Sequence, residues 1–348
     1  MKPLQRLGIF ISINIFVVTL VQSPLMASDV RVLVSPDQKK QLAELERSLP
    51  NLELVAAKSD QILDVIGDCD AIIGLGYGGD RSRQIIQAGK KLRWVHSTSA
   101  GVENTVWIPE LKDSDIILTN AKIFQGPEIA DHAFGLLLTL TRNLKQFNRR
   151  MDEGWERITP DLPIIELRHK TILIVGLGGI GTQIAQRASA FDMRVLAVDP
   201  KDIPLMHIVE RVVRPDQLHE VLPQADVVVS SVPHTAASEG MFGKNEFALM
   251  KDGVYFVNVS RGKVVQTEAL VEALRSGKVR AAGLDVTNPE PLPKNHQLWK
   301  MNNVIITPHI ATVSIQSRTR LLELIRSNIE RFVTGRPMLN VVNKAAGF

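Results

Sequence analysis

Cysteine is almost absent from this chain of 348 residues: Cys69 is the only one. No disulfide can form within the chain, so its stability has to come from hydrophobic cores, and a chain of this length is long enough to build two domains. Cys69 stands in the apolar segment IGDCDAII. That setting favours a buried, unreactive thiol over a nucleophile.

Signatures of metal binding and of nucleic-acid binding are also missing. The sequence has no HExxH or CxxC motif and no carboxylate cluster, so we expect no metal site. The formal net charge is +4, and Lys2 and Arg6 supply two of those units. The rest of the chain is close to neutral, which does not suit a nucleic-acid partner and leaves a small molecule as the expected one.

An apolar run of 15 residues, 7–21, is short for a transmembrane helix of about 20 residues. A basic start precedes the run and small residues follow it, which is the layout of a secretory signal peptide cleaved near Ala27. We expect residues 1–27 to be a signal peptide or N-terminal anchor, and the protein to be exported or periplasmic. The alternative is a cytoplasmic protein, if Met26 is the true start or the leader is not used.

Short apolar segments alternate with amphipathic ones along the rest of the chain, which predicts an α/β fold with parallel sheets covered by helices on both faces. The expected strands of a first series are Val30–Val34, Leu52–Ala56, Ala71–Gly74, Arg93–Ser97 and Ile116–Thr119. Those of a second series, rich in Val, Ile and Leu, are Thr171–Val175, Arg194–Val198, Asp226–Ser230, Val254–Val259, Ala281–Asp285 and Val304–Thr307.

Three helices complete this pattern. Apolar residues recur at helical spacing in 37–48 and, over a broader stripe, in 127–147. The broad stripe suits a helix that bridges domains or dimerises, and a role in the core of one chain is as compatible with it. The last helix, 314–334, is expected to pack back on the first domain. We therefore predict one domain from 28–126 with 312–348, and a second, inserted domain from 127–311.

The second series opens with a dinucleotide-binding motif. The strand 171–175 runs into a G-x-G-x-x-G loop formed by Gly176, Gly178, Gly179, Ile180 and Gly181. The glycines allow a tight turn and a close approach of backbone to a pyrophosphate, and the following helix presents free N–H groups to it. Asp199 ends the next strand, where a carboxylate binds ribose hydroxyls and repels a 2′-phosphate. The sequence thus favours NAD, while nearby Lys201 leaves NADP as the less favoured cofactor.

Three polar residues follow later strands of the same series: Arg261, Glu290 and His309. Residues that follow parallel strands meet at one edge of the sheet. A guanidinium that holds a carboxylate and an imidazole that exchanges a proton are the groups needed to transfer a hydride to the C2 carbon of a 2-oxo acid. Each residue alone is more typical of structure or surface, and only their ordered combination favours catalysis.

At these positions the sequence resembles the D-isomer-specific 2-hydroxyacid dehydrogenases, which include phosphoglycerate dehydrogenases and glyoxylate/hydroxypyruvate reductases. The resemblance covers residues 30–335 and is carried by VGLGGIGTQIA, by MKDGVYFVNVSRGKVVQTEALVEALRSGKVRAAGLDV and by PEPLPKNHQLWKMNNVIITPHIA. It implies two Rossmann-like domains, with a flavodoxin-like substrate domain and an inserted NAD-binding domain. It also implies that Arg261 binds substrate, that His309 is the general acid/base and that Glu290 bonds to the imidazole.

The resemblance implies further site residues. Ser99, Ala100 and Gly101 would form the loop that binds the substrate carboxylate. Besides the glycine loop and Asp199, the cofactor would contact Val232, Pro233, Val259, Ser260, Arg261, Asp285 and His309. The pocket for the substrate side chain would involve residues 75–79 and Trp299, which do not specify one acid.

A homodimer through residues 127–150 is implied as well. Two residues depart from the family pattern: Asp131 stands where Glu is common, and His234 where an apolar residue is usual. Because some relatives act as NAD-responsive corepressors, a non-catalytic NAD-sensing protein of the same fold is the alternative function. A third reading is an exported protein with a structural or scavenging role.

Overall fold

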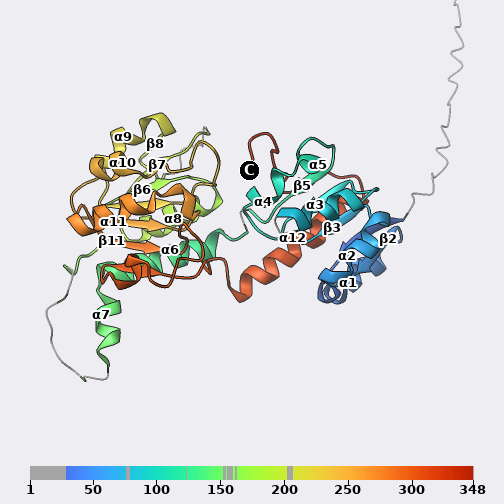
Figure 1. Cartoon of the computed structure of the whole chain (residues 1–348), viewed down its shortest axis with the longest axis horizontal. Coiled ribbons are helices and arrows are strands. Elements are labelled where there is room, and N and C mark those ends of the chain that lie inside the picture. The colour runs from blue at the N-terminus through green and yellow to red at the C-terminus, as the bar shows by residue number, and fades with distance from the viewer. Residues whose placement is uncertain are drawn as a thin grey trace, which may run out of the picture.

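The computed structural model describes residues 29–75, 79–122, 124–151, 154, 160, 163–201 and 207–347. The predicted leader, residues 1–27, lies outside these ranges. Among the described residues no helix is long and apolar enough to cross a membrane. Two parallel sheets form two separate lobes (Figure 1), so the predicted α/β class is confirmed.

The first sheet has the strand order β2-β1-β3-β4-β5. Its strands are β1 (Val30–Val34), β2 (Leu52–Ala56), β3 (Ala71–Ile73), β4 (Trp94–His96) and β5 (Ile117–Thr119). Around it lie the helices α1 (Pro36–Ser48), α2 (Ile62–Val65), α3 (Gly79–Ala88), α4 (Glu103–Val106), α5 (Pro109–Lys112) and α12 (Ile315–Val333). Although α12 comes from the far end of the chain, its Ile325 and Ile329 are buried in one core with Trp94.

The second sheet has the strand order β12-β11-β10-β9-β6-β7-β8. Its strands are β6 (Thr171–Val175), β7 (Arg194–Val198), β8 (Arg211–Val213), β9 (Val227–Ser230), β10 (Val254–Asn258), β11 (Val279–Leu284) and β12 (Val304–Ile306). Its helices are α6 (Gly126–Thr141), α7 (Leu144–Arg149), α8 (Gly179–Ala190), α9 (Leu218–Val221), α10 (Lys244–Leu249) and α11 (Thr267–Ser276). The edge strand β8, three residues long, was not predicted.

The long helix predicted over 127–147 is wrong in one respect, because it is broken. α6 ends at Thr141 and α7 begins at Leu144, and between them Asn143 has a φ of +54°. Asparagine is one of the few residues that adopts this left-handed conformation readily, so it ends one helix and redirects the next. As a result Leu144, Phe147 and Met151 are exposed rather than packed on the sheet.

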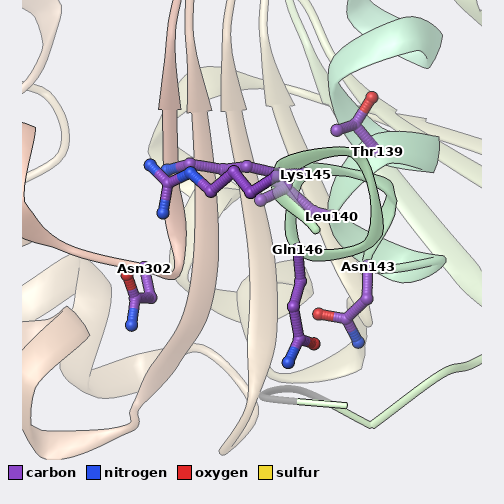
Figure 2. A pocket seen from close by; sticks show the side chains of 7 residues that line it. Thr139, Leu140, Asn143, Lys145, Gln146 and Asn302 are labelled. Carbon is purple, nitrogen blue, oxygen red and sulfur yellow. The ribbon is translucent and has the colours of Figure 1, made fainter. Parts of the chain in front are cut away.

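The start of α7 is fixed to the second sheet. Lys145 donates a hydrogen bond of 2.5 Å to the carbonyl oxygen of Val304, the first residue of β12. Figure 2 shows the small pocket here, which is lined by side chains of α6 and α7, by Asn143 between them and by Asn302. Because it lies where β12 begins, this pocket is at the opposite edge of the sheet from the residues that follow the strands.

The chain crosses between the lobes at the starts of α6 and α12. Arg320 of α12 forms an ion pair with Glu128 in the first turn of α6, and its Nε donates to the carbonyl oxygen of Phe124 at 2.9 Å. Glu128 is almost buried, with 9% of its side chain exposed. The two crossings are therefore joined to each other by a charged pair.

A buried histidine ends β4 in the first lobe. His96 is fully buried, and its Nδ1 lies 2.8 Å from the hydroxyl of Thr119. That hydroxyl also accepts a hydrogen bond from the indole of Trp94 at 2.8 Å. Burial lowers the pKa of His96 to about 4, because a charged imidazole would lose its hydration here.

The pKa of His96 predicts a loss of stability in acid. On acidification the unfolded chain takes up the proton near pH 6.5, well before the folded chain does, so the unfolding free energy falls between about pH 6.5 and pH 4. From pH 7 to pH 5 this amounts to about 2 kcal/mol. Urea unfolding at both pH values should show a smaller acid loss in His96→Gln than in the wild type, and equal losses would contradict the assignment.

Candidate active site

The glycine loop between β6 and α8 leaves room for a ligand. Gly176 has a φ of +97°, and a Cβ built on Gly181 would lie 2.0 Å from the carbonyl oxygen of Gly176. Neither position therefore accepts a side chain without a shift of backbone. A Cβ on Gly178 would have nothing within 4 Å, so this glycine faces open space just where the N-terminus of α8 presents its N–H groups.

Asp199, directly after β7, is fixed against this loop. It is 7% exposed, and its carboxylate accepts the backbone N–H groups of Leu177 and Lys201, each at 2.9 Å. A carboxylate has about four acceptor positions, so hydrogen bonds from two ribose hydroxyls remain feasible. Open glycine backbone, helix N-terminus and fixed acid together fit a dinucleotide.

The residues predicted to bind the cofactor or to act in catalysis follow strands of the second sheet at one edge, while the predicted substrate loop, residues 99–101, follows β4 of the first sheet. Across the strand order from β7 to β12 they come in the sequence Asp199, glycine loop, Val232 and Pro233, Val259 to Arg261, Asp285 and Glu290, and His309. The groups expected to bind the adenosine end thus lie at one end of the edge, and the acid–base groups at the other.

His309 and Glu290 are in contact, as the sequence predicts. Nδ1 of the imidazole lies 2.7 Å from Oε1 of Glu290, and both side chains are partly exposed. An ionised carboxylate only accepts hydrogen bonds, so Nδ1 has to carry the donated hydrogen. Nε2 is then the nitrogen left to exchange a proton with a substrate.

Asp285 holds the backbone that carries His309. His309 has a φ of +53°, a conformation that is unfavourable for residues other than glycine. The Asp285 carboxylate accepts the N–H groups of Ile310 and Ala311, each at 3.0 Å, and its carbonyl oxygen accepts the N–H of His309 at 2.8 Å. Asp285 is only 2% exposed and holds the loop of His309 by these hydrogen bonds. Its expected contact with nicotinamide stays a prediction.

Two residues that the sequence analysis did not select complete this support. The Thr307 hydroxyl donates to Asp285 at 2.6 Å and therefore accepts from Nε2 of His132, which lies 2.8 Å away. His132 belongs to α6, so this chain of hydrogen bonds ties the helix to the loop of His309. The sequence carries little signal for it, because His132 lies 153 or more residues before its partners.

Arg261 reaches across to the first lobe. Its Nε donates to Oε1 of Glu103 in α4, and its Nη1 donates to its own neighbour, the carbonyl oxygen of Ser260, at 2.8 Å. A Cβ built on Gly101 would lie only 1.8 Å from Nη2 of Arg261. The guanidinium therefore rests on the loop that was predicted to bind the substrate carboxylate.

That loop, residues 99–101, is fixed from behind. The side-chain amide of Asn120 donates to the carbonyl oxygen of Ala100 at 2.6 Å, and the backbone N–H of Ala121 donates to that of Ser99 at 3.1 Å. Gly262, like Gly101, allows a close contact that a side chain would block, since a Cβ there would lie 1.8 Å from the carbonyl oxygen of Thr287. The guanidinium of Arg261 thus contacts the loop 99–101, and the next residue, Gly262, contacts the segment that leads to Glu290.

The comparison with known families decides what this arrangement is. Residues 134–311 match the NAD-binding domain of the D-isomer specific 2-hydroxyacid dehydrogenases, which is half of the chain. The chain belongs to this family. It is thus an NAD(P)-dependent oxidoreductase that acts on CH–OH donors, and the family expected from the sequence is confirmed.

Individual relatives agree with this assignment. The chain is 34% identical to a hydroxypyruvate reductase of Blautia hydrogenotrophica over 82% of this chain and 88% of the relative. It is 34% identical to a D-3-phosphoglycerate dehydrogenase of Archaeoglobus fulgidus over 86% of this chain, and spans only 53% of that longer protein. A family structure from Xanthobacter autotrophicus, in complex with NADPH and MES, superposes with a TM-score of 0.76 at 26% identity, covering 92% of this chain and all of that one.

Other positions expected from the family pattern serve local structure. The hydroxyl of Ser260 is buried against Ser230 and Asn258, at 2.9 and 2.7 Å, and its backbone N–H donates to the side-chain oxygen of Asn258 at 3.0 Å. The carbonyl oxygen of Pro233 accepts the hydroxyl of Ser238 at 2.6 Å, which fixes the turn after β9. Val232 packs partly buried against the core beneath, and Val259 is 6% exposed.

The departures from the family pattern also have partners. Asp131 pairs with Arg187 at 2.7 Å, and His234 lies 3.3 Å from Glu239. Of the expected side-chain pocket, residues 76–78 lie outside the described residues, and Trp299 is 46% exposed with its indole N–H on the carbonyl oxygen of Pro293. Within the described ranges no group of three or more His, Cys, Asp or Glu is placed to hold a metal.

Two glycine variants test the cofactor site. Gly178→Ala should fold with the stability of the wild type, because its methyl group meets no protein atom, yet bind NADH at least about tenfold more weakly, because it fills the space that backbone leaves for the pyrophosphate. Gly181→Ala should instead lower the melting temperature. Fluorescence titration and thermal unfolding measure both effects, and tight NADH binding by Gly178→Ala would contradict the placement.

Proposed function

We propose that this protein transfers a hydride between NAD(H) and the C2 carbon of a small D-2-hydroxy acid or 2-oxo acid, with His309 as general acid/base. The observation that carries the proposal is the close packing of three loops: Arg261 on Gly101, and Gly262 on the loop of Glu290, which in turn holds His309. Carboxylate-binding and proton-transferring groups are thereby brought to one edge of the sheet. The names of the relatives, reductases and dehydrogenases of such acids, agree with this chemistry.

The chain's own residues account for binding and proton transfer. Arg261 and the backbone N–H groups of residues 99–101 bind the substrate carboxylate, and the guanidinium polarises the C2 carbonyl. When bound, the nicotinamide supplies the hydride to C2 or accepts it in the reverse direction. His309 donates a proton from Nε2 to the C2 oxygen during reduction and takes it back during oxidation.

Glu290 serves as a positioning group in this scheme. Its carboxylate fixes the tautomer of His309 and stabilises the imidazolium form that has to donate the proton. The left-handed backbone of His309, held by Asp285, turns the imidazole toward Glu290 without help from the substrate. The acid–base pair is therefore assembled before the reaction begins.

Removing the imidazole tests this role. His309→Ala should lower kcat for reduction of glyoxylate or hydroxypyruvate by about 10²–10⁴-fold, while NADH binds as tightly as in the wild type. His219→Ala, at an exposed histidine outside the site, is the matched control and should keep full turnover. Stopped-flow absorbance of NADH gives the rate, and unchanged turnover in His309→Ala would remove the residue from its role.

We further propose that NAD is preferred over NADP. The fixed, nearly buried carboxylate of Asp199 supports this, because a 2′-phosphate beside it would face a negative charge. Lys201 and the NADPH-bound relative favour the alternative.

Asp199→Asn separates the two cofactors. The amide oxygen keeps a hydrogen bond to Leu177, while the charge is removed, so kcat/KM for NADPH should rise at least about tenfold relative to that for NADH. Initial rates with each cofactor measure the ratio. A wild type that already prefers NADPH would contradict the proposal.

The assembly and location expected from the sequence are proposals of the same kind. Exposed Leu144, Phe147 and Met151, at and after α7, support a homodimer through residues 127–150. Light scattering of the purified protein gives its mass, and a monomer would exclude the dimer.

The leader pattern supports export, which N-terminal sequencing of the protein from each cell fraction would test.

A further inference from the structure

Glu103 places a negative charge inside the proposed substrate site. Its carboxylate comes from the first lobe and takes the Nε of Arg261, the cation proposed to bind substrate. Both side chains are mostly shielded, at 23% and 31% exposed. Burial opposes ionisation of Glu103, but Arg261, with His234 nearby, holds its pKa below the usual value, so it is ionised at neutral pH.

His234, which acts on the pKa of Glu103, and other charged groups of the proposed site and of α3 have partners of their own. His234 lies 3.3 Å from Glu239, and His309 is bonded to Glu290. Two arginines follow the loop expected to line the side-chain pocket, and both point to other groups: Arg81 donates to the carbonyl oxygen of Ser59, and Arg83 to Glu110. The one positive charge of Arg261 is thus balanced within the protein before any substrate arrives.

We propose that Glu103 is a specificity-determining residue that restricts the site to 2-oxo acids carrying a single negative charge, a selectivity that rests on the proposed function. Glu103 takes Nε of Arg261 and the carbonyl oxygen of Ser260 takes one N–H of Nη1, so the substrate carboxylate binds to Nη2 and to the second N–H of Nη1. A second carboxylate or a phosphate on C3 then meets the charge of Glu103 in a partly buried site. Two like charges within one partly buried site repel each other strongly, because little water screens them.

A pair of 2-oxo acids of equal size tests this charge limit. Oxaloacetate carries two carboxylates, and its 4-amide, 2-oxosuccinamate, carries one. Titration calorimetry with NAD⁺ bound measures both affinities without turnover, since the oxidised cofactor cannot reduce them. We expect the wild type to bind the amide at least about tenfold more tightly, and Glu103→Gln to reduce that preference at least about tenfold.

Two further variants separate charge from structure. Glu103→Asp keeps the charge and should keep the preference for the amide even if both ligands bind more weakly. Glu239→Gln removes an exposed charge near His234 and should change the ratio less than about twofold. Equal binding of the two acids by the wild type, or a ratio that Glu103→Gln leaves unchanged, would overturn the proposal.

The same proteins separate this inference from the proposed function. If NADH reduces neither acid, nor glyoxylate, while the binding preference holds, the proposed reaction fails and the charge limit stands. If NADH reduces glyoxylate but oxaloacetate binds as well as its amide, the reaction stands and the role of Glu103 fails.

Discussion

The hydrogen bonds of the Asp285 carboxylate are the constraint on which the active edge depends. A histidine with positive φ is held in place because both carboxylate oxygens are occupied by groups of the same loop, and Thr307 connects them to His132 of α6. Such a buried, fully bonded carboxylate is costly to disturb, since each lost partner leaves an unsatisfied group in the protein interior. The imidazole is thus presented by the fold itself.

The second sheet carries the residues proposed to bind the cofactor and to act as acid–base groups, but only part of the proposed substrate site. Arg261 follows a strand of this sheet, and its side chain contacts Glu103 and Gly101 in the other lobe. The proposed substrate site therefore depends on contacts between the two lobes, whereas the proposed cofactor site is formed by the second lobe alone.

Much of this was predictable from local pattern. β1, β2, β6 and β7 were predicted to the residue because each is a five-residue segment with mostly apolar side chains. β8 was missed, since it has only three residues and just two of them are apolar. The break at Asn143 was missed because apolar residues keep helical spacing on both sides of it.

The site shows the same division. The glycine loop, Asp199, Glu290 and His309 could be selected as candidates from the sequence because each follows a strand. Glu103 was not selected, although it follows Gly101 by two residues, because its contact is with an arginine 158 residues away in the other lobe. The hydrogen bonds of the Asp285 carboxylate to the loop of His309 were not predicted either, since sequence order does not say which groups a carboxylate contacts.

The return of α12 to the first lobe has a consequence for how the chain acquires its structure. The lobe of the second sheet is one continuous segment, from α6 to β12, so all of its strands can pair once β12 has left the ribosome. The first sheet is made earlier, yet Ile325 and Ile329, which cover it beside Trp94, follow the whole second sheet in the chain. During synthesis, then, the sheet translated first keeps an apolar face open until the second lobe has also been translated.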